Sequence, residues 1–476
     1  MGLLCALGAC VVAAAAVRVW AAQDELWLDE IWTLLSLGRN NNSLLDILTA
    51  HHDNNHYLIT FWMYFTSPQQ NWFVYRIPSV LAGIGTVILA ARVAARWGNR
   101  AALAAAILTG ASFMMVFYAS EARGYALAGF FSLVAFLALD RYLDRRELGM
   151  AAVFGLATIL GTLSHLTFVQ FYAGALAWSV FALTKRKGSS QTEFAPLIAL
   201  HIVPASFLMM LYAFDVREMK FGGGDPYVMH DMVLNACALA VGTFGAAQPI
   251  VWGSVGLGII AAVAALLLLW REKADVWIFF LVAFVITPTL LLSVKPPPVL
   301  HERYFYLNIL FFLILLSYLF DRVAARGRAS MYGAIAILGL FVLPNANLTY
   351  HFLRVGRGHF FDALAYMAEH SRGADVLMSG DAEFTYRLYT EFYGPYVPGD
   401  HDFHIITIVP EMPVEPEWVI LNNQDQPYAP KPAILDSKGN EAFTLERVFP
   451  YAGLSGAHFA IYHRTTMRNA PSQAEE

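Results

Sequence analysis

The sequence predicts a mostly helical, polytopic membrane protein that ends in a small soluble α/β domain. Hydrophobic residues make up 58% of the 476 positions, mean hydropathy is +0.50, and 14% of residues are charged. Soluble domains carry about 25% charged residues. Apolar runs of bilayer-spanning length recur up to about residue 345, and the pattern then changes.

Eleven apolar segments predict transmembrane helices. They are 2–21, 74–95, 101–118, 122–141, 149–165, 166–184, 195–214, 251–270, 275–293, 304–321 and 330–346. The first segment also fits a cleavable signal, but we expect it to be retained as a membrane anchor. Two further apolar stretches, 56–66 and 231–247, are expected not to cross, and the first of them fits an interfacial helix.

Basic residues in the short loops set the predicted orientation. They fall in one set of loops, at Arg92, Arg96, Arg100, Arg141, Arg145, Arg146, Lys185, Arg186, Lys187, Arg271, Lys273, Arg322, Arg326 and Arg328. These loops become cytoplasmic, as does the N-terminus. The tail then lies outside, which divides the chain into a transmembrane domain (1–346), with a long first external loop (22–73), and an extracytoplasmic domain (347–476).

The tail alternates helical and strand patterns. Residues 357–372 have helical periodicity, and strands are predicted from Asp375, at 404–409, at 418–421 and at 458–463. The polar end after Met467 is expected to be disordered. No basic stripe is present, which argues against nucleic-acid binding, and the three cysteines have neither zinc-site nor disulfide spacing.

The other loops carry potentially chemical residues from five distant segments. Asp29 and Glu30 follow the first span, and they are either solvated interfacial acids or include one general base. Glu121 and Arg123 lie between two spans, where they form either a salt bridge or an acidic site with an anion-binding arginine. Arg303 at a helix start either snorkels or binds phosphate.

The loop at 51–56 is rich in histidine and asparagine. Asn54 and Asn55 are candidates for hydrogen bonds to sugar hydroxyls, and His56 for phosphate or metal binding. His51, His52, Asp53 and His56 are credible ligands for a divalent metal, although their spacing is not diagnostic of one. The alternative is helix capping by asparagine and an interfacial histidine.

The order of these motifs resembles a known family. Trp27-Leu28-Asp29-Glu30, the Asn-Asn-His loop, Arg76-Ile77-Pro78-Ser79, Tyr118-Ala-Ser-Glu121-Ala-Arg123-Gly-Tyr125 and a late Arg303-Tyr304 follow one another. This order is similar to that of the protein O-mannosyltransferase-like superfamily, specifically the bacterial RgtA/B/C/D-like glycosyltransferases of family-39 type. The resemblance is clearest over residues 24–140. The family often has His-Pro-Pro-Leu where this chain has Asn54-Asn55-His56-Tyr57.

The resemblance implies a GT-C fold in a bacterial inner-membrane protein. It implies transfer of a sugar from a polyprenyl-phosphate donor, usually with inversion, to a glycan, lipid or protein acceptor on the extracytoplasmic face. By motif, Asp29 would match the catalytic aspartate, Glu121 the second acidic position and Arg303 the basic residue near the carrier phosphate.

The remaining candidate substrate-binding residues are Glu30, Asn54, Asn55, His56, Arg123, Tyr125, Lys295 and Tyr304. The sequence identifies no cofactor with certainty, and a divalent metal is the candidate. Two alternatives stay open: a transporter or flippase of a lipid-linked substrate, and a non-catalytic assembly or sensor protein.

Overall fold

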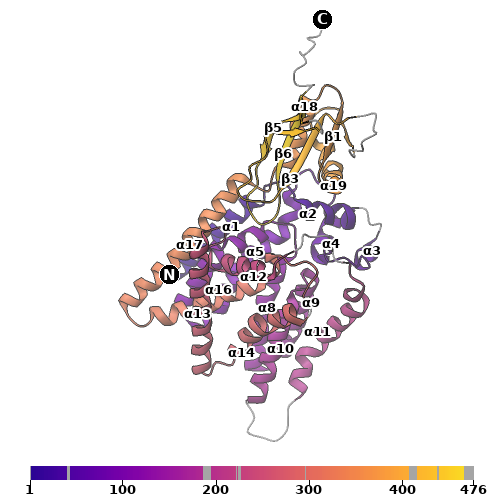
Figure 1. Ribbon diagram of the computed structural model, residues 1–476. Coiled ribbons are helices and arrows are strands. Elements are labelled where there is room, and N and C mark those ends of the chain that lie inside the picture. The colour runs from indigo at the N-terminus through magenta and orange to yellow at the C-terminus, as the bar shows by residue number, and fades with distance from the viewer. Residues whose placement is uncertain are drawn as a thin grey trace. The chain divides into compact units, whose positions relative to one another are not determined.

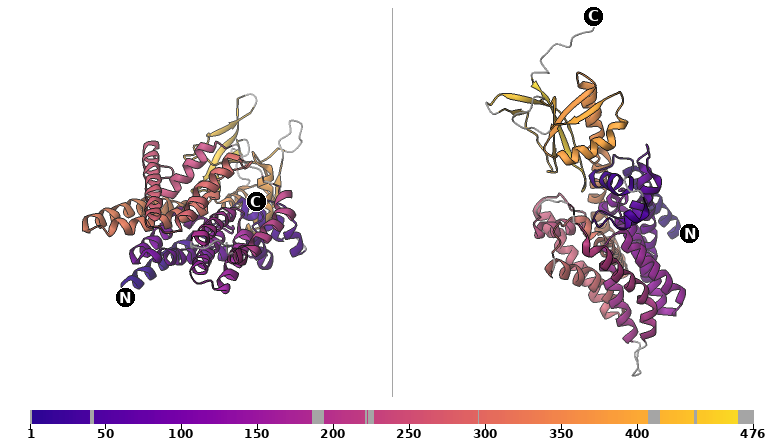
Figure 2. Two further views of the ribbon diagram at one scale, coloured as in Figure 1. Left: turned by 90° about the horizontal axis from the view of Figure 1, so that it is seen from below. Right: turned by 90° about the vertical axis from the view of Figure 1, so that its right-hand side faces the viewer.

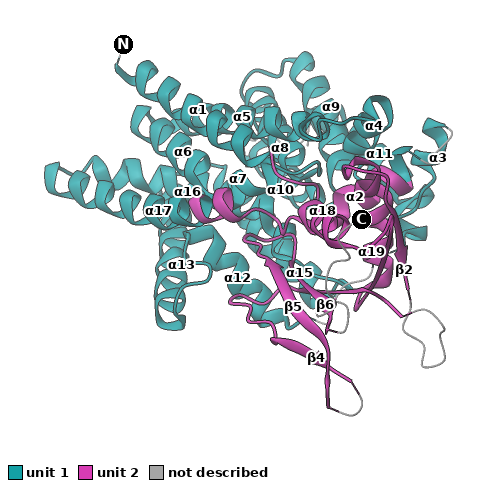
Figure 3. Cartoon of the chain, turned by 90° about the horizontal axis from the view of Figure 1, so that it is seen from above, with its two compact units in different colours: residues 1–22, 37–349 teal, residues 23–36, 350–476 magenta. Residues whose placement is uncertain are grey.

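The computed structural model describes residues 2–39, 43–185, 194–220, 222, 227–294, 296–406, 415–436 and 439–465. It divides into two compact units (Figure 3). The helical unit comprises residues 1–22 and 37–349, and the C-terminal unit comprises residues 23–36 and 350–476. The start of the predicted external loop, with Asp29 and Glu30, therefore groups with the C-terminal unit.

Helices of the structure coincide with the predicted spans, and those at 101–118 and 275–293 are each divided into shorter helices (Figure 1). They are α1 (Gly2–Ala21), α5 (Phe73–Ala94), α6 (Asn99–Ala111), α7 (Phe113–Ala119), α8 (Tyr125–Arg145), α9 (Leu148–Ser164), α10 (Phe168–Lys185), α11 (Phe194–Phe214), α13 (Gln248–Arg271), α14 (Trp277–Leu281), α15 (Thr287–Val294), α16 (Tyr306–Ala324) and α17 (Arg328–Val355). Among the described residues, eight helices are long and apolar enough to cross a membrane, and the bent α6–α7 pair would be a ninth. The 17-residue α9 lies at the lower limit of spanning length.

The two segments expected not to span form short helices. These are α4 (Tyr57–Thr66), with 10 residues, and α12 (Met229–Val241), with 13 residues. At 1.5 Å per residue they rise about 15 and 20 Å, which is less than the roughly 30 Å of a hydrocarbon core. Neither can cross a bilayer as a single helix.

The bend between α6 and α7 is held by two polar side chains. The two helices meet at 60° around Ser112. The amide of Phe113 donates to Asn345 Oδ1 (2.8 Å), so the carbonyl of Thr109 loses its usual helical partner. The buried Arg18 on α1 supplies a replacement by donating to the carbonyls of Thr109 (3.0 Å) and Gly110 (3.3 Å). Arg18 therefore has a structural reason to lie in the apolar helix α1, because it satisfies backbone carbonyls that the bend between α6 and α7 leaves without a helical partner.

Helices α8, α9 and α10 pack side by side (Figure 2). Helix α8 begins beside a polar cavity that contains Arg123 and Tyr125. Its other end borders a second cavity of about 730 Å³ with Arg92, Arg96, Arg141 and Arg145 on its wall. The 21 residues of α8 rise about 30 Å, so the two polar ends are one hydrocarbon thickness apart.

The C-terminal unit contains a six-stranded sheet in the order β2-β1-β3-β6-β5-β4. The strands are β1 (Asp375–Gly380), β2 (Asp402–Ile405), β3 (Trp418–Asn423), β4 (Ala433–Leu435), β5 (Glu441–Phe449) and β6 (His458–Arg464). Strand β1 pairs in parallel with β2 and β3, and the other neighbours are antiparallel. The predicted α/β domain is present.

Two helices, α18 (Phe360–His370) and α19 (Glu383–Tyr393), pack against this sheet. Phe360 stacks on Tyr389 with ring centroids 4.4 Å apart and meets Phe459 of β6 at 5.0 Å. This aromatic cluster joins both helices to the sheet. The short helix α2 (Leu28–Trp32) contacts α19, and Tyr393 donates a hydrogen bond to the carbonyl of Leu26 (2.7 Å). The predicted disorder after Met467 falls outside the described residues.

Candidate functional site

A polar cavity of about 150 Å³ lies in the helical unit where five segments meet. Its walls come from the loop at 53–57, the turn before α8, the α9–α10 connection at 162–167, Met219, and the stretch from Pro297 to Tyr304. The structure thus brings together seven of the predicted site residues. They are Asn54, Asn55, His56, Arg123, Tyr125, Arg303 and Tyr304, with the candidate metal ligand Asp53 beside them.

The turn before α8 is tied to the histidine-rich loop. Arg123 Nη1 donates to Asn54 Oδ1, and the amide of Gly124 donates to His56 Nδ1 (2.7 Å). Position 124 admits only glycine, because a Cβ there would lie 1.7 Å from the carbonyl oxygen of Ser164. The loop and the turn therefore form one rigid wall of the cavity.

Asn55 has a structural role of the kind that the helix-capping alternative describes for the asparagines of this loop. Its Nδ2 donates to the carbonyls of Ile47 (2.7 Å) and Ala50 (3.3 Å), and its Oδ1 accepts from Thr60 (3.0 Å). The side chain is buried and is used to fix the loop at the start of α4. A sugar hydroxyl would have to displace these bonds, so the expectation of substrate binding fits Asn54 better than Asn55.

Two histidines and two tyrosines form an aromatic cluster on the cavity wall. The ring of His165 lies 4.4 Å from Tyr125, 4.9 Å from His56 and 5.9 Å from Tyr304, measured between centroids. His165 comes from the end of α9, and its Nδ1 accepts from the amide of Thr167 (3.2 Å). The sequence placed His165 at a helix end but assigned it no role.

Both histidines are held neutral. Burial, together with the charges of Arg123 and Arg303, lowers the pKa of His165 to about 3. Burial, with the same arginines and His165, also holds the pKa of His56 well below its usual 6.5. Since each Nδ1 accepts a backbone N–H, each neutral ring carries its proton on Nε2. Two arginines and two neutral imidazole donors make the cavity rich in hydrogen-bond donors, which suits a ligand rich in oxygen acceptors.

Arg303 and Tyr304 lie in a 3₁₀ turn, Glu302–Phe305, that leads into α16. Asn235 of α12 fixes this turn by donating to Glu302 Oε1 (3.0 Å). Tyr227 donates to the carbonyl of Pro297 (2.6 Å) and fixes the approach to it. The arginine is therefore carried by a braced loop rather than a freely snorkelling helix end. Lys295, predicted to assist it, lies outside the described residues.

The predicted metal ligands of the 51–56 loop do not gather into a site. His51 pairs with Asp215 (Nδ1 to Oδ1, 2.8 Å), and Asp53 Oδ1 lies 3.1 Å from His52 and accepts from the amide of Gly222 (2.9 Å). Burial raises the pKa of Asp53, but the contacts with His52 and Gly222 outweigh it and lower the pKa overall. Among the described residues, no three of these side chains bring donor atoms together as a metal would require.

Glu121 and Arg76 are buried in the helical unit outside the walls of this cavity. Glu121 follows α7, and Arg76 lies in the first turn of α5, where its Nη1 donates to the carbonyl of Ala22 (3.2 Å). In the sequence Arg76 was noted only as part of the Arg76-Ile77-Pro78-Ser79 motif, and it was not a candidate site residue. A buried arginine in an apolar span was the available signal, because such a residue is costly without a partner or a function.

Asp29 and Glu30 belong to the C-terminal unit, and their surroundings there differ. Glu30 is fully buried, and its Oε2 accepts from the amide of Trp27 (3.1 Å), so it caps α2. This capping role, rather than substrate binding, is the one that the geometry gives Glu30. Asp29, the residue before Glu30 in α2, is partly exposed.

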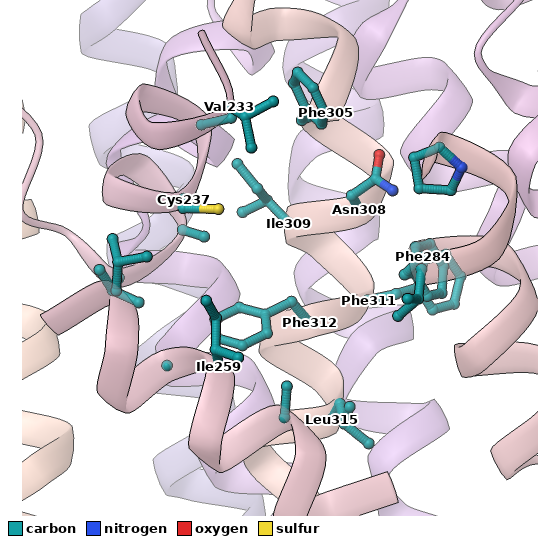
Figure 4. A pocket seen from close by; sticks show the side chains of 18 of the residues that line it. Val233, Cys237, Ile259, Phe284, Phe305, Asn308, Ile309, Phe311, Phe312 and Leu315 are labelled. Carbon is teal, nitrogen blue, oxygen red and sulfur yellow. The ribbon is translucent and has the colours of Figure 1, made fainter. Parts of the chain in front are cut away.

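An apolar cavity of about 320 Å³ lies elsewhere in the helical unit, between α12, α13, α15 and α16 (Figure 4). Val233, Ile259, Phe284 and Phe312 are among the side chains that point into it, and Asn308 is a polar exception. No acidic or basic side chain of the described residues lines it. Phe305 and Asn308 of its wall follow directly after Arg303 and Tyr304 of the polar cavity.

Known structures share this architecture. ArnT from Cupriavidus metallidurans matches in the form bound to undecaprenyl phosphate (13% identity, TM-score 0.51, 98% of each chain) and in the apo state (12% identity, TM-score 0.52, 97% of this chain and 98% of the other). The Archaeoglobus fulgidus oligosaccharyltransferase matches at 12% identity and a TM-score of 0.49, over 84% of this chain and 64% of its own. This chain thus spans less than two thirds of the archaeal protein.

No protein-family model matches the sequence, and no curated protein matches it. The likeness to ArnT identifies the fold as the GT-C fold, as the sequence resemblance implied.

Proposed function

We propose that the chain is a membrane glycosyltransferase that moves a sugar from a polyprenyl-phosphate donor to an acceptor hydroxyl. This proposal rests on one observation: the residues at the start of α16 line both the polar and the apolar cavity. Arg303 and Tyr304 line the donor-rich polar cavity, and Phe305 and Asn308 line the apolar one. A ligand with an anionic sugar-phosphate head and a long isoprenoid tail matches this pair of cavities. One of the similar ArnT structures is bound to undecaprenyl phosphate, which supports the same donor class.

In this proposal the head of the donor occupies the polar cavity. The planar guanidinium groups of Arg123 and Arg303 suit phosphate oxygens, which they can bind with two parallel hydrogen bonds. Tyr125, Tyr304 and the neutral imidazoles offer ring faces and N–H donors for a sugar. Because His56 and His165 stay uncharged, they bind hydroxyl groups without adding a second ionic site.

The chemistry needs one base and a stabilised leaving group. Asp29 takes the proton from the acceptor hydroxyl, whose oxygen attacks C1 of the sugar from the face opposite the phosphate. The C1–O bond to phosphate breaks, and its electron pair leaves with the polyprenyl phosphate. Arg303, aided by Arg123 or Lys295, stabilises the growing phosphate charge, and Glu121 orients the acceptor or Asp29. Such a displacement inverts C1.

The proposed location is the bacterial inner membrane. The arginine-rich ends of the helices would face the cytoplasm, and the polar cavity and the C-terminal unit would face the periplasm. The proposed acceptor is a hydroxyl group of a glycan, a lipid or a protein.

The transporter alternative gains no support from the cavities. A transporter would require a charged pathway near the middle of the membrane. The apolar cavity has no acidic or basic side chain among its described lining residues, and the charged cavities lie at opposite ends of α8. This arrangement favours binding of a lipid tail over passage of a polar substrate.

Lipid-phosphate binding by purified protein tests the proposal. Arg303→Gln should weaken binding of undecaprenyl phosphate at least about tenfold, since a charge-assisted bidentate pair contributes about 1.5–3 kcal/mol. Arg326→Gln, at an exposed position between α16 and α17, is the matched control and should bind normally. Undecaprenol, which lacks the phosphate, should bind weakly and equally to both variants. Equal affinity of Arg303→Gln and the unmodified protein for undecaprenyl phosphate would contradict the proposal.

A further inference from the structure

The C-terminal unit contains a cluster of three potential metal ligands that the proposed glycosyl transfer does not use. Glu25 precedes α2, and His359 and Asp362 lie at the start of α18. One donor atom from each lies within 4.8 Å of the other two. His359 Nδ1 is 3.4 Å from Asp362 Oδ2 and 3.9 Å from Glu25 Oε1.

The hydrogen bond of His359 orients its lone pair. His359 Nε2 lies 2.8 Å from the carbonyl oxygen of Val355, which can only accept, so Nε2 carries the proton. In the neutral ring Nδ1 is then a lone-pair donor, and it faces two carboxylates. Three electron-rich atoms repel one another unless a metal ion or a proton lies between them, and the hydrogen bond with Asp362 accordingly raises the pKa of His359 to about 9. A histidine that binds metal through one nitrogen commonly donates the other N–H to a backbone carbonyl, as His359 does.

The backbone fixes this arrangement in advance. His359 has φ of +54° and ψ of 55°, the left-handed conformation that a residue with a Cβ seldom adopts. Gly356, three residues before His359, also has a positive φ, and a Cβ there would lie 2.9 Å from His359 Nε2. Glu25 is held by its other oxygen, because Oε2 accepts from the amide of Phe361 (2.9 Å). Its Oε1 therefore remains directed at the histidine.

Two of the three separations are close to those around a small divalent cation, and the third is at most 4.8 Å. Ligand atoms about 2.1 Å from a tetrahedral zinc ion lie roughly 3.4 Å from each other. The His359–Asp362 separation has this value already, and the His359–Glu25 separation exceeds it by about 0.5 Å. One imidazole and two carboxylates form a ligand set that transition metals accept, with water completing the coordination.

We propose that Glu25, His359 and Asp362 bind a divalent transition-metal ion, zinc being the expected one, which ties the segment before α2 to α18. The ion would stabilise the part of the chain that carries Asp29, and it takes no part in the transfer. The alternative occupant is a proton on His359 Nδ1, which would form ion pairs with the same carboxylates.

Zinc titration of the full-length, untagged protein, first stripped with a chelator, separates these possibilities. Calorimetry with zinc chloride alone should show a site that Asp362→Asn and His359→Gly each weaken at least about tenfold, which is the loss that even outer-shell changes produce. Asp362 is exposed, and glycine tolerates the left-handed conformation at 359, so both variants should fold. Glu369→Gln, which removes another exposed carboxylate from α18, is the matched control and should bind as the unmodified protein does.

Zinc should also raise the melting temperature of the unmodified protein and of Glu369→Gln, but not that of the two ligand variants. Equal zinc affinity in all four proteins, or no binding by the unmodified protein, would overturn the proposal. These readouts do not involve sugar transfer, so they stand or fall independently of the proposed enzyme activity.

Discussion

Replacing Gly124 by alanine should damage the polar cavity without removing any of its side chains. The added Cβ would lie 1.7 Å from the carbonyl oxygen of Ser164, and the two backbone segments would have to separate by about 1.7 Å to restore an ordinary contact of 3.4 Å. Gly124 donates its amide to His56 Nδ1 at 2.7 Å, and its chain neighbours are Arg123 and Tyr125. The displacement would therefore break the bond to His56 and move two cavity residues.

The expected magnitude follows from the size of this shift. Overpacking of a closed contact costs about 1–3 kcal/mol of stability. A misplacement of about 1 Å can cost 100-fold in rate, so we expect transfer from a polyprenyl-phosphate sugar to fall at least about 100-fold. Gly253→Ala is the control, because a Cβ at this α13 position meets no atom within 4 Å. It should keep full activity and gain up to about 1 kcal/mol of helix stability.

The assay compares the melting temperature and the transfer rate of both variants with those of the unmodified protein. A Gly124→Ala protein that melts and transfers normally would refute the close packing of the turn against the α9–α10 connection. A loss of stability with normal transfer would refute the assignment of this cavity to the donor.

Three further predictions concern the lipid cavity and two buried titratable groups. Ala262→Phe fills part of the apolar cavity and should weaken binding of undecaprenyl phosphate more than binding of a short-chain isoprenyl phosphate; equal effects would argue against a tail in that cavity. Burial raises the pKa of Glu25 to about 8 from 4.5, so the folded state binds more protons there and stability should fall as pH rises from about 4.5 to 8. Melting curves of Glu25→Gln, which cannot ionise, should lack this fall. Burial lowers the pKa of His165 to about 3 from 6.5, so stability should fall as pH falls through this interval, and His165→Asn should reduce that acid sensitivity. Unchanged pH profiles in these variants would contradict the two assignments.

The fold was largely predictable because helix length and apolar composition are properties of local sequence. The predicted spans coincide with helices. Helix α4 is short because its apolar stretch is short, whereas α12 ends at Gly242, whose φ of 82° is left-handed. Helix α19 was not predicted, since its buried aromatic residues are interrupted by charges and its mean hydropathy is low. The bend at Ser112 was also not predicted. It depends on Arg18 and Asn345, which are far apart in sequence.

The site was predictable in its residue types but not in how each side chain is used. The motif order predicted a shared site for Arg123, His56 and Arg303, and the fold places all three on the wall of one cavity. Which hydrogen bonds Asn55 and Glu30 satisfy depends on partners that only the fold supplies. The sequence therefore left substrate binding and capping both open for Asn55, and it did not reveal that Glu30 caps α2. The sequence predicted a metal site in the histidine-rich loop. In the structure His51 instead pairs with Asp215, and Asp53 accepts a hydrogen bond from Gly222. The three-ligand cluster combines Glu25 with residues more than 300 positions away, and no local spacing reveals it.

The most direct test of the central claim is sugar transfer from a purified polyprenyl-phosphate sugar by the unmodified protein and by Asp29→Asn. The substitution keeps the size of the side chain and removes its basicity. We expect transfer to fall by at least about 100-fold, the lower end of what a general base contributes, while undecaprenyl phosphate binding and the melting temperature stay unchanged. Transfer at the unmodified rate by well-folded Asp29→Asn would contradict Asp29 as the base, and absence of transfer by the unmodified protein from every polyprenyl-phosphate sugar would contradict the enzyme itself.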